Sequence, residues 1–370
     1  MISKRASMIE ASGIRKVFDL AASLDDPINL SIGQPHFDAT AEVKAAAIEA
    51  IEAGRNSYLM SPGLPELREK ARRALSDSSG AELEDAMVTG GVAGGLTMAY
   101  LALVDPGDEV LVPDPYFVCY KTLAHLAGGV PVFVDTYPEF RLDAHAIAEK
   151  VTDRTKLLIL NSPCNPTGVV YSAEDLSAVA ELAREHDFIV ISDEIYDCFS
   201  YGGEATSVAR FCPERTLVLN GLSKRAGVTG WRLGFAAGPA EIIQQMIKLQ
   251  QFTFVCAPSV AQYAALAAMD EPFGAHRDEY AAKRDRICSA LEGAFEFVRP
   301  DGAFYIFPRA PWGTGTEFVT ECVKNSLLVV PGGVFSQEDT HFRVSFAAED
   351  ETIDRGVEIL LRLAASGPPA

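Results

Sequence analysis

A lysine and an arginine stand eight residues apart in a glycine-rich part of the sequence, Asn220–Phe235. A lysine becomes a nucleophile for a carbonyl carbon when its pocket favours the neutral amine, as a nearby cation or a dry setting does. Lys224 has Arg232 as such a neighbour. The planar donors of Arg232 and the hydroxyl of Ser223 suit a phosphate dianion, and the glycines let a ligand approach the backbone. We therefore predict a reactive lysine beside a phosphate site, although Lys224 taken alone would be interpreted as a surface residue.

Short β-rich runs alternate with helical ones between residues 86 and 238. The expected strands are 87–89, 109–112, 130–135, 157–161, 188–192, 216–220 and 233–237. Such alternation predicts βαβ units and a mainly parallel sheet, whose functional groups gather at the carboxyl ends of its strands. Asn161, Asp193 and Lys224 all fall at or just past such ends.

A second glycine cluster, Thr89–Leu96, follows the first of these strands and is expected to open a helix that ends near Val104. Small residues there would let the main-chain N–H groups of Val92 and Ala93 meet a phosphate at the positive end of the helix. The cluster lacks the glycine order of a nucleotide-binding loop, so it is weak evidence alone. Together with Arg232 it predicts one shared phosphate site.

Four segments, in order along the chain, carry a resemblance to a known family. They are N-S-P-C-N-P-T-G at 161–168, S-D-E-I-Y at 192–196, S-K-x₅-G-W-R-x-G from Ser223 to Gly234, and F-R-V-S at 342–345. These resemble the motifs of class I/II pyridoxal-phosphate (PLP) aminotransferases, the fold type I family of aspartate aminotransferase. Matching segments run from about Asn29 to Ser345, so the resemblance covers most of the chain.

The resemblance implies an α/β protein of two domains, in agreement with a length above the usual limit of one core. We expect a large domain with a mainly parallel seven-stranded sheet sandwiched by helices, and a smaller α+β domain. The expected division is an N-terminal arm with part of the small domain at 1–40, the PLP-binding domain at 41–270 and the rest of the small domain at 271–370. The last part should contain short strands at 303–307, 327–330 and 341–345 and a final helix at 349–364.

The family motifs also imply catalytic and cofactor-binding roles. Lys224 would bind the PLP aldehyde covalently and move the proton at the substrate Cα. Asp193 would keep the pyridine nitrogen protonated, and Tyr196 and Asn165 would hydrogen-bond the phenolic oxygen. Without the resemblance, Asp193 would be interpreted as a helix cap and Asn165 as a turn residue.

Phosphate and ring contacts follow from the same resemblance. The phosphate would be held by Arg232, Ser223, Val92 and Ala93, with more weight on these groups because Gly221 stands where many members have a serine. Phe117 is expected to stack on the cofactor, with Tyr116 as the alternative. Tyr58 would reach the phosphate of a partner subunit, or else be a buried structural tyrosine.

Substrate contacts are expected at Arg343, Gly33 and Asn165. Arg343 would bind the α-carboxylate bidentately and so orient the Cα–H bond, although an arginine on an edge strand usually faces water. Gly33 would lie near the same carboxylate or be an ordinary loop glycine.

The segments that carry a second cation in dicarboxylate-specific members, here 252–258 and 91–95, contain no lysine or arginine. A buried distal carboxylate without a counter-charge is costly. This predicts a neutral apolar or aromatic amino donor beside Ile14, Phe18 and Val92, unless Arg15 or Arg225 swings in to accept an acidic co-substrate.

The charge and the cysteine content of the sequence disfavour several classes of binding partner. A formal charge of −19 with a pI near 4.7 disfavours nucleic acid and anionic membranes. Seven cysteines without C-x-x-C or metal-ligand spacing fit a reducing cytoplasm and predict no metal site. No secretory signal is expected.

The sequence thus predicts a cytoplasmic homodimeric PLP aminotransferase that uses an amino acid and a 2-oxo acid in a ping-pong reaction. A PLP-dependent C–S β-lyase of the same fold is the alternative, because both reactions begin by removing the Cα proton. A regulatory ligand-binding module of this fold is disfavoured, since Lys224 is present and no DNA-binding segment precedes the domain.

Overall fold

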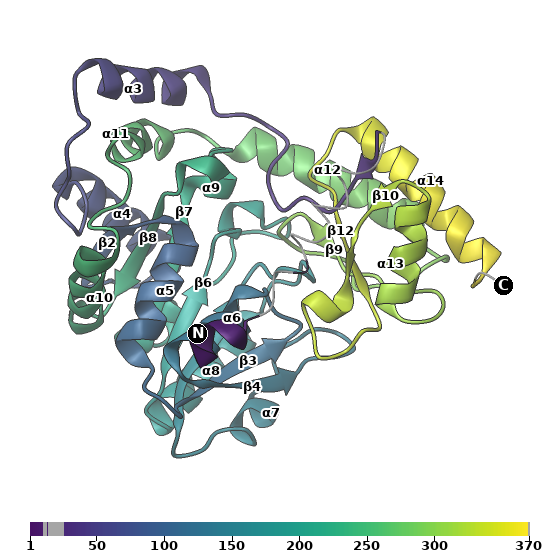
Figure 1. Ribbon diagram of the computed structural model, residues 1–370, viewed down its shortest axis with the longest axis horizontal. Helices are drawn as coiled ribbons and strands as arrows, with labels where there is room; N and C mark the ends of the chain where they lie inside the picture. Colours follow the sequence, from purple (N-terminus) through teal and green to yellow (C-terminus); the bar gives the residue numbers. More distant parts are fainter. Residues whose placement is uncertain (10–12, 14–25, 369–370) are drawn as a thin grey trace.

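The computed structural model describes residues 1–9, 13 and 26–368. Three residues named above for the substrate pocket, Ile14, Arg15 and Phe18, lie outside the described residues. Figure 1 shows one large sheet with its helices and, beside it, a second group of short strands packed against the helices nearest the C-terminus.

The large sheet has seven strands in the order β2-β8-β7-β6-β5-β3-β4. Their bounds are Asp85–Thr89 (β2), Glu109–Asp114 (β3), Val130–Asp135 (β4), Thr155–Asn161 (β5), Ile189–Asp193 (β6), Thr216–Gly221 (β7) and Gly234–Gly238 (β8). β8 runs antiparallel to both of its neighbours, and the other pairings are parallel. The predicted mainly parallel seven-stranded sheet is confirmed.

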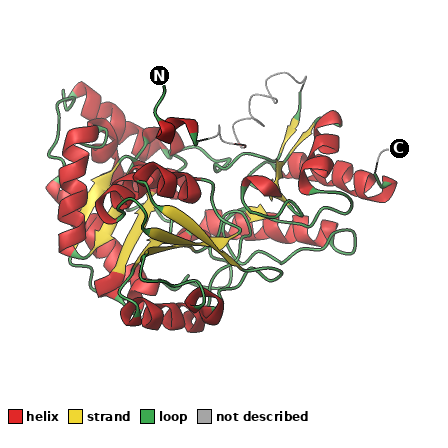
Figure 2. Cartoon of the chain, turned by 60° about the horizontal axis from the view of Figure 1, so that its bottom comes forward, coloured by secondary structure: helices red, strands yellow, loops and turns green. Residues whose placement is uncertain are grey.

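Both faces of this sheet are covered, which explains why its strands read as continuous apolar runs. In β5, Leu157 and Ile159 point into one hydrophobic cluster, whereas Leu158 and Leu160 point into another. All four side chains are buried. Figure 2 shows helices on both sides of the strands.

Helix boundaries follow local signals in the sequence. The hydroxyl of Thr40 accepts a hydrogen bond from the N–H of Val43 at 3.3 Å and caps the start of α3 (Ala41–Glu52). Pro65 begins α4 (Pro65–Ser79), where the missing N–H of proline costs nothing. α5 (Gly91–Leu103) follows the glycine cluster directly after β2.

The remaining α-helices include the final one, which was predicted at 349–364 and spans Asp350–Ser366. They are Lys4–Ser7 (α1), Cys119–Ala127 (α6), Ala144–Ala148 (α7), Ala173–Glu185 (α8), Leu222–Arg225 (α9), Ala240–Thr253 (α10), Ser259–Ala268 (α11), Gly274–Leu291 (α12), Gly315–Lys324 (α13) and Asp350–Ser366 (α14). None of the helices in the described ranges is long and apolar enough to cross a membrane.

The C-terminal part contains two small sheets. β9 (Tyr305–Ile306), β11 (Val330–Pro331) and β12 (Phe342–Ser345) form the C-terminal sheet in the order β11-β12-β9. β1 (Ile28–Asn29) pairs in parallel with β10 (Leu327–Leu328).

Two strand predictions in this part are wrong in detail. The single strand expected at 327–330 is divided between the two small sheets. The strand expected at 303–307 is shorter because Ala303 has a φ of 53°, in the left-handed region, which ends extended pairing.

The chain between β1 and α3 crosses from the C-terminal part to the large sheet. The N–H of Leu30 donates to the carbonyl of Leu328 at 2.9 Å, and the N–H of Ser345 donates to the carbonyl of Leu30 at 2.7 Å. These bonds attach the segment to both small sheets. Gly33 therefore lies beside the carboxyl ends of the large sheet's strands.

Candidate active site

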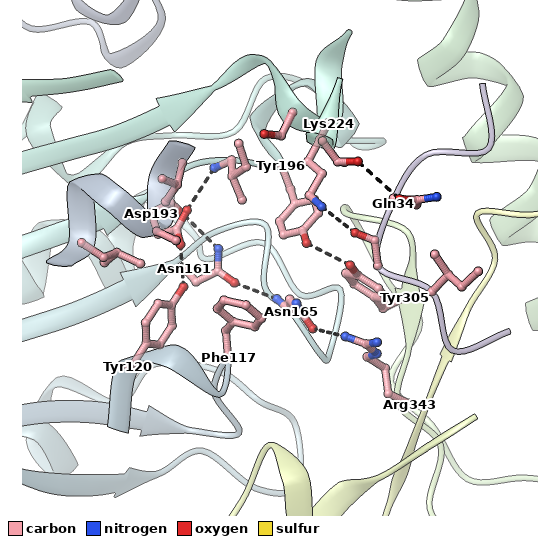
Figure 3. A pocket seen from close by; sticks show the side chains of 18 of the residues that line it. Gln34, Phe117, Tyr120, Asn161, Asn165, Asp193, Tyr196, Lys224, Tyr305 and Arg343 are labelled. Atoms are coloured by element: carbon pink, nitrogen blue, oxygen red, sulfur yellow. Dashed lines mark hydrogen bonds between the residues drawn. The ribbon is translucent and has the colours of Figure 1, made fainter. Parts of the chain in front are cut away.

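A cavity of about 340 Å³ lies where the carboxyl ends of β5, β6 and β7 meet the first turn of α5, the segment around Gly33 and the C-terminal sheet. Figure 3 shows how its side chains converge. Of the predicted site residues, those that line it are Gly33, Val92, Ala93, Phe117, Asn165, Asp193, Tyr196, Ser223, Lys224, Arg232 and Arg343. Tyr58, which was predicted to contact the phosphate of a partner subunit, does not line this central cavity.

Lys224 lies in α9, which begins directly after β7, and so projects from the carboxyl end of a central strand. Its Nζ donates a hydrogen bond to the carbonyl oxygen of Gly33. The pKa of this amine is lowered to about 8, chiefly by burial and further by the positive charges of Arg343 and Arg232, against the opposing effect of Asp193. The pocket therefore makes the neutral, nucleophilic form of the lysine far more accessible than it is in water.

Asp193 ends β6 and is 2% exposed. Its Oδ2 accepts a hydrogen bond from the Tyr120 hydroxyl at 2.8 Å, and its Oδ1 accepts one from the N–H of Ile195 at 3.3 Å. Burial raises the pKa of this carboxyl to about 6, although both hydrogen bonds act to lower it. The carboxylate is therefore fixed in place and would be stabilised by a positive partner in the cavity.

Asn161 and Asn165 connect the backbone of Asp193 to the other side of the cavity. The Nδ2 of Asn161 donates to the carbonyl oxygen of Asp193 at 2.9 Å, and its Oδ1 accepts from the N–H of Asn165 at 2.8 Å. The Oδ1 of Asn165 accepts in turn from Nη1 of Arg343 at 3.0 Å. The chain of dashed lines in Figure 3 follows these contacts.

Arg343 lies on β12, the central strand of the C-terminal sheet, and is 1% exposed. The interpretation as a water-facing arginine on an edge strand is wrong, because β12 lies between two strands and the guanidinium packs against the rings of Tyr305 and Phe335. Its Nη2 donates to the carbonyl of Ser31 at 2.7 Å, whereas its Nε has no hydrogen-bond partner among the described residues. A buried guanidinium with only neutral acceptors and one unpaired donor is prepared to bind an anion.

The first turn of α5 and Arg232 form an electropositive end of the cavity that suits an anion. The N–H groups of Val92 and Ala93 belong to this first turn, which has no carbonyl partners within the helix. A Cβ atom at Gly91, whose φ is 74°, would lie 2.7 Å from Nη2 of Arg232. Glycine at this position therefore lets the guanidinium pack against the helix terminus, as the predicted shared phosphate site requires.

The two aromatic candidates for stacking differ in location. Phe117 lines the cavity, whereas Tyr116 does not. Tyr116 instead stacks on Phe133 with ring centroids 5.1 Å apart, and its hydroxyl accepts from Nε2 of Gln337 at 2.8 Å. The structure thus favours Phe117 over the alternative.

Tyr58 is 83% exposed, so its interpretation as a buried structural tyrosine is wrong. The part of the chain that carries it precedes α4 and leaves the side chain free of the cavity in its own subunit. Its contact with a partner subunit stays a prediction.

Lys224, Arg232 and Arg343 are the lysines and arginines that line the cavity in the described part of the chain. Arg225 points elsewhere, because its Nη2 donates to the carbonyl of Glu271 at 2.9 Å. The rest of the wall is largely apolar and includes Ile32, Leu96 and Ile195.

Besides the apolar wall residues, the sequence did not indicate four polar or aromatic residues of the cavity: Gln34, Tyr120, Thr229 and Tyr305. Tyr120 belongs to the segment P-D-P-Y-F-V-C-Y that singled out Phe117, so its place one helical turn later could have indicated it. Tyr305 lies outside every motif, and only the pairing of β9 with β12 brings it to the site.

A family model for aminotransferase class I and II matches residues 25–360. The chain is a class I/II aminotransferase. The aspartate aminotransferase of Pyrococcus abyssi is 39% identical over 96% of both chains. Aromatic-amino-acid aminotransferase 2 of Thermococcus litoralis is 37% identical, also over 96% of both. The solved structure of Thermus thermophilus aspartate aminotransferase with maleate has a TM-score of 0.94 at 36% identity, covering 98% of this chain and 99% of that one.

Membership confirms the predicted fold type I architecture and the predicted cofactor, because aminotransferases of this family use pyridoxal phosphate. The side chains that line the cavity match the functional groups of pyridoxal phosphate. A lysine with a pKa of about 8 and a buried carboxylate lie across one space from an arginine packed on a helix N-terminus. These groups match an aldehyde, a basic ring nitrogen and a phosphate, respectively.

Proposed function

We propose that this aminotransferase moves the amino group of a neutral apolar or aromatic amino acid to a 2-oxo acid by a ping-pong mechanism. One observation carries the choice of substrate. Each cation lining the described cavity already has a role, with Lys224 for the reaction, Arg232 for a phosphate and Arg343 for an α-carboxylate. A distal carboxylate would be buried against Ile32, Leu96 and Ile195 without a counter-charge, which is costly.

The names of relatives include both aspartate and aromatic-amino-acid aminotransferases. Family membership therefore does not identify the amino acid that gives the amino group. The lining of the cavity favours an amino acid with an uncharged side chain. Val92 lies beside the apolar wall residues and supports an aromatic or aliphatic side chain there.

The proposed cofactor contacts use groups that already face one another. Asp193 would hold a proton on the ring nitrogen, and Phe117 would cover the ring. Tyr196 and Asn165 would donate hydrogen bonds to the phenolic oxygen. The phosphate would be bound by Arg232, the Ser223 hydroxyl and the N–H groups of Val92 and Ala93.

Bound pyridoxal phosphate would supply an aldehyde for the amino group and a ring that withdraws electrons from Cα. Arg343 would bind the α-carboxylate through two parallel N–H donors, with the backbone of Gly33 close by. This contact fixes which Cα bond faces Lys224. Lys224, whose pKa of about 8 places the neutral amine within reach at physiological pH, would take the proton from Cα and return it at another position.

A second copy of the chain would complete the site. Tyr58 and Phe252 are each 83% exposed, and Met60 is 58% exposed, which is unusual for large apolar side chains in a monomer. We propose a homodimer in which these side chains are covered and Tyr58 reaches the partner's phosphate site. We also propose the domain division 1–40, 41–270 and 271–370, with the first and last parts forming the small domain.

Product analysis tests the proposal. Purified holoenzyme would be incubated with phenylalanine, leucine, alanine or aspartate and 2-oxoglutarate, and separately with cysteine-like substrates. We expect glutamate and the matching 2-oxo acid from the neutral donors. Pyruvate with ammonia from a cysteine-like substrate would instead indicate the C–S β-lyase, and no product in any mixture would contradict both enzymatic readings.

A further inference from the structure

Tyr305 touches two of the proposed active-site residues at once. It lies on β9 and is 0% exposed. Its hydroxyl oxygen is 2.9 Å from that of Tyr196, and the guanidinium carbon of Arg343 is 4.5 Å from the centre of its ring. Figure 3 shows Tyr305 between Tyr196 and Arg343.

Strand pairing holds Tyr305 in this position. β9 pairs with β12 so that Ser345 lies opposite Tyr305 and Val344 lies opposite Ile306. Arg343 is carried by the same β12 strand. On the other side, a Cβ atom at Gly33 would lie 3.0 Å from the Tyr305 hydroxyl, so the segment around Gly33 also packs closely against it. Tyr305 has little freedom to move away from either partner.

The two hydroxyl groups can share only one hydrogen. A phenol has one O–H donor, so either Tyr196 donates to Tyr305 or Tyr305 donates to Tyr196. In the second arrangement the single hydrogen of Tyr196 is free for an acceptor in the cavity. The proposed contact of Tyr196 with the phenolic oxygen of the cofactor therefore requires Tyr305 to be the donor.

The charge of Arg343 favours that arrangement. A cation beside the ring stabilises the electron density that a donating phenol gains, and the guanidinium of Arg343 lies against the ring of Tyr305. Burial raises the pKa of both hydroxyls and the charge of Arg343 lowers both, but the hydrogen bond between them lowers the pKa of Tyr305 and raises that of Tyr196, which makes Tyr305 the better donor. When a substrate carboxylate neutralises Arg343, this support is reduced. The hydrogen bond from Tyr305 to Tyr196 then weakens.

We propose that Tyr305 is a positioning residue that couples the carboxylate site at Arg343 to the hydroxyl of Tyr196. The proposal rests on the proposed function, in which Tyr196 donates to the cofactor's phenolic oxygen and Arg343 binds the substrate carboxylate. Tyr305 itself transfers no proton to substrate. It sets how strongly Tyr196 donates, and it makes that strength depend on the charge state at Arg343.

A double-mutant cycle tests the coupling without relying on turnover. Tyr305→Phe keeps the ring and removes the hydroxyl, while Arg343→Gln removes the charge. In holoenzyme of wild type, both single variants and the double variant, one measures the pH midpoint at which the visible absorbance of bound PLP changes. A weaker donor at the phenolic oxygen leaves the conjugated nitrogen more basic, so Tyr305→Phe should raise the midpoint. One hydrogen bond corresponds to a roughly three- to tenfold change in the equilibrium, which is about half to one pH unit.

The expected result is a clearly smaller rise when the second substitution is already present. An equal rise in both backgrounds, or no rise in either, overturns the coupling. If Arg343→Gln does not retain PLP, Arg343→Met replaces it in the double-mutant cycle, because methionine is also uncharged and is similar in length. Tyr201→Phe is the matched control, because the Tyr201 hydroxyl donates to the carbonyl of Ala303, two residues from Tyr305, outside the central cavity. This control should leave the midpoint unchanged, and a rise equal to that of Tyr305→Phe would reduce the effect to general packing and overturn the proposal.

The results distinguish a failure of the proposed function from a failure of the role proposed for Tyr305. Loss of glutamate formation by the wild type would contradict the proposed function. Normal glutamate formation together with equal midpoint shifts would contradict only the role of Tyr305.

Discussion

The Nζ of Lys224 donates a hydrogen bond to the carbonyl oxygen of Gly33, 191 residues away in the sequence. This contact joins α9, at the end of a central strand, to a segment that is itself bonded to both small sheets. The reactive amine is thus enclosed by both parts of the chain, and the enclosure is the main cause of its low pKa.

Replacement of the lysine tests its assigned role. Lys224→Ala removes the amine that would take the Cα proton, so we expect loss of turnover by several orders of magnitude. PLP should still bind through the phosphate contacts of Arg232 and α5, which equilibrium dialysis can measure. Full activity in this variant would contradict the mechanism.

Asp193→Asn tests the proposed contact of this carboxylate with the ring nitrogen of the cofactor. The amide cannot hold the ring proton by charge, so Cα–H exchange of a bound amino acid, followed by NMR in deuterated water, should slow by orders of magnitude. An unchanged exchange rate would remove Asp193 from the site.

Without cofactor, the buried carboxyl of Asp193 should make the stability of the protein depend on pH. The folded-state pKa of Asp193, about 6, lies above the ordinary value of 3.8 for this carboxyl, so the folded state binds more protons between these values. The free energy of unfolding should therefore fall as pH rises from about 4 to 6, by roughly 2 to 3 kcal/mol from this group. Denaturant titrations of Asp193→Asn should lack this part of the pH dependence. A wild-type curve that parallels the variant's from pH 4 to 6 would show that Asp193 does not carry a raised pKa.

Arg343→Lys keeps the positive charge but removes the planar pair of donors. We expect KM for the amino donor to rise by about ten- to a hundredfold, since one charge-assisted bond is lost and the α-carboxylate is less well oriented. Affinity for PLP should change little in this variant. Steady-state kinetics with phenylalanine and a PLP titration of the apoprotein measure both effects, and an unchanged KM would assign the carboxylate to another group.

Tyr58→Phe tests the shared site. The variant should weaken PLP binding by a few-fold, the scale of one hydrogen bond, without dissociating the dimer. Sedimentation velocity with a parallel PLP titration reads both properties. A wild-type monomer would remove the argument for a residue contributed by the partner.

Much of the site was predictable because it follows strands whose order fixes their neighbours. Asn161, Asp193 and Lys224 were placed by the ends of apolar runs, and parallel pairing brings such ends together. Arg343 and Asn165 came from the family resemblance and not from periodicity.

What the sequence did not reveal depends on contacts between distant segments. Tyr305 follows Ala303, whose positive φ is not encoded by any local preference of alanine, and it reaches the cavity only through pairing with β12. Likewise, the hydrogen bond between Lys224 and Gly33 depends on β1 pairing with β10 at the opposite end of the chain. No pattern within a window of the sequence carries this information.

The most direct test of the account is a comparison of kcat/KM for four amino donors with 2-oxoglutarate as acceptor. The lining of the cavity predicts that phenylalanine, leucine or alanine exceeds aspartate by at least about tenfold, the equivalent of one uncompensated polar group. A kcat/KM for aspartate well above all three neutral donors would show that a cation reaches the side-chain pocket and that the proposed substrate class is wrong.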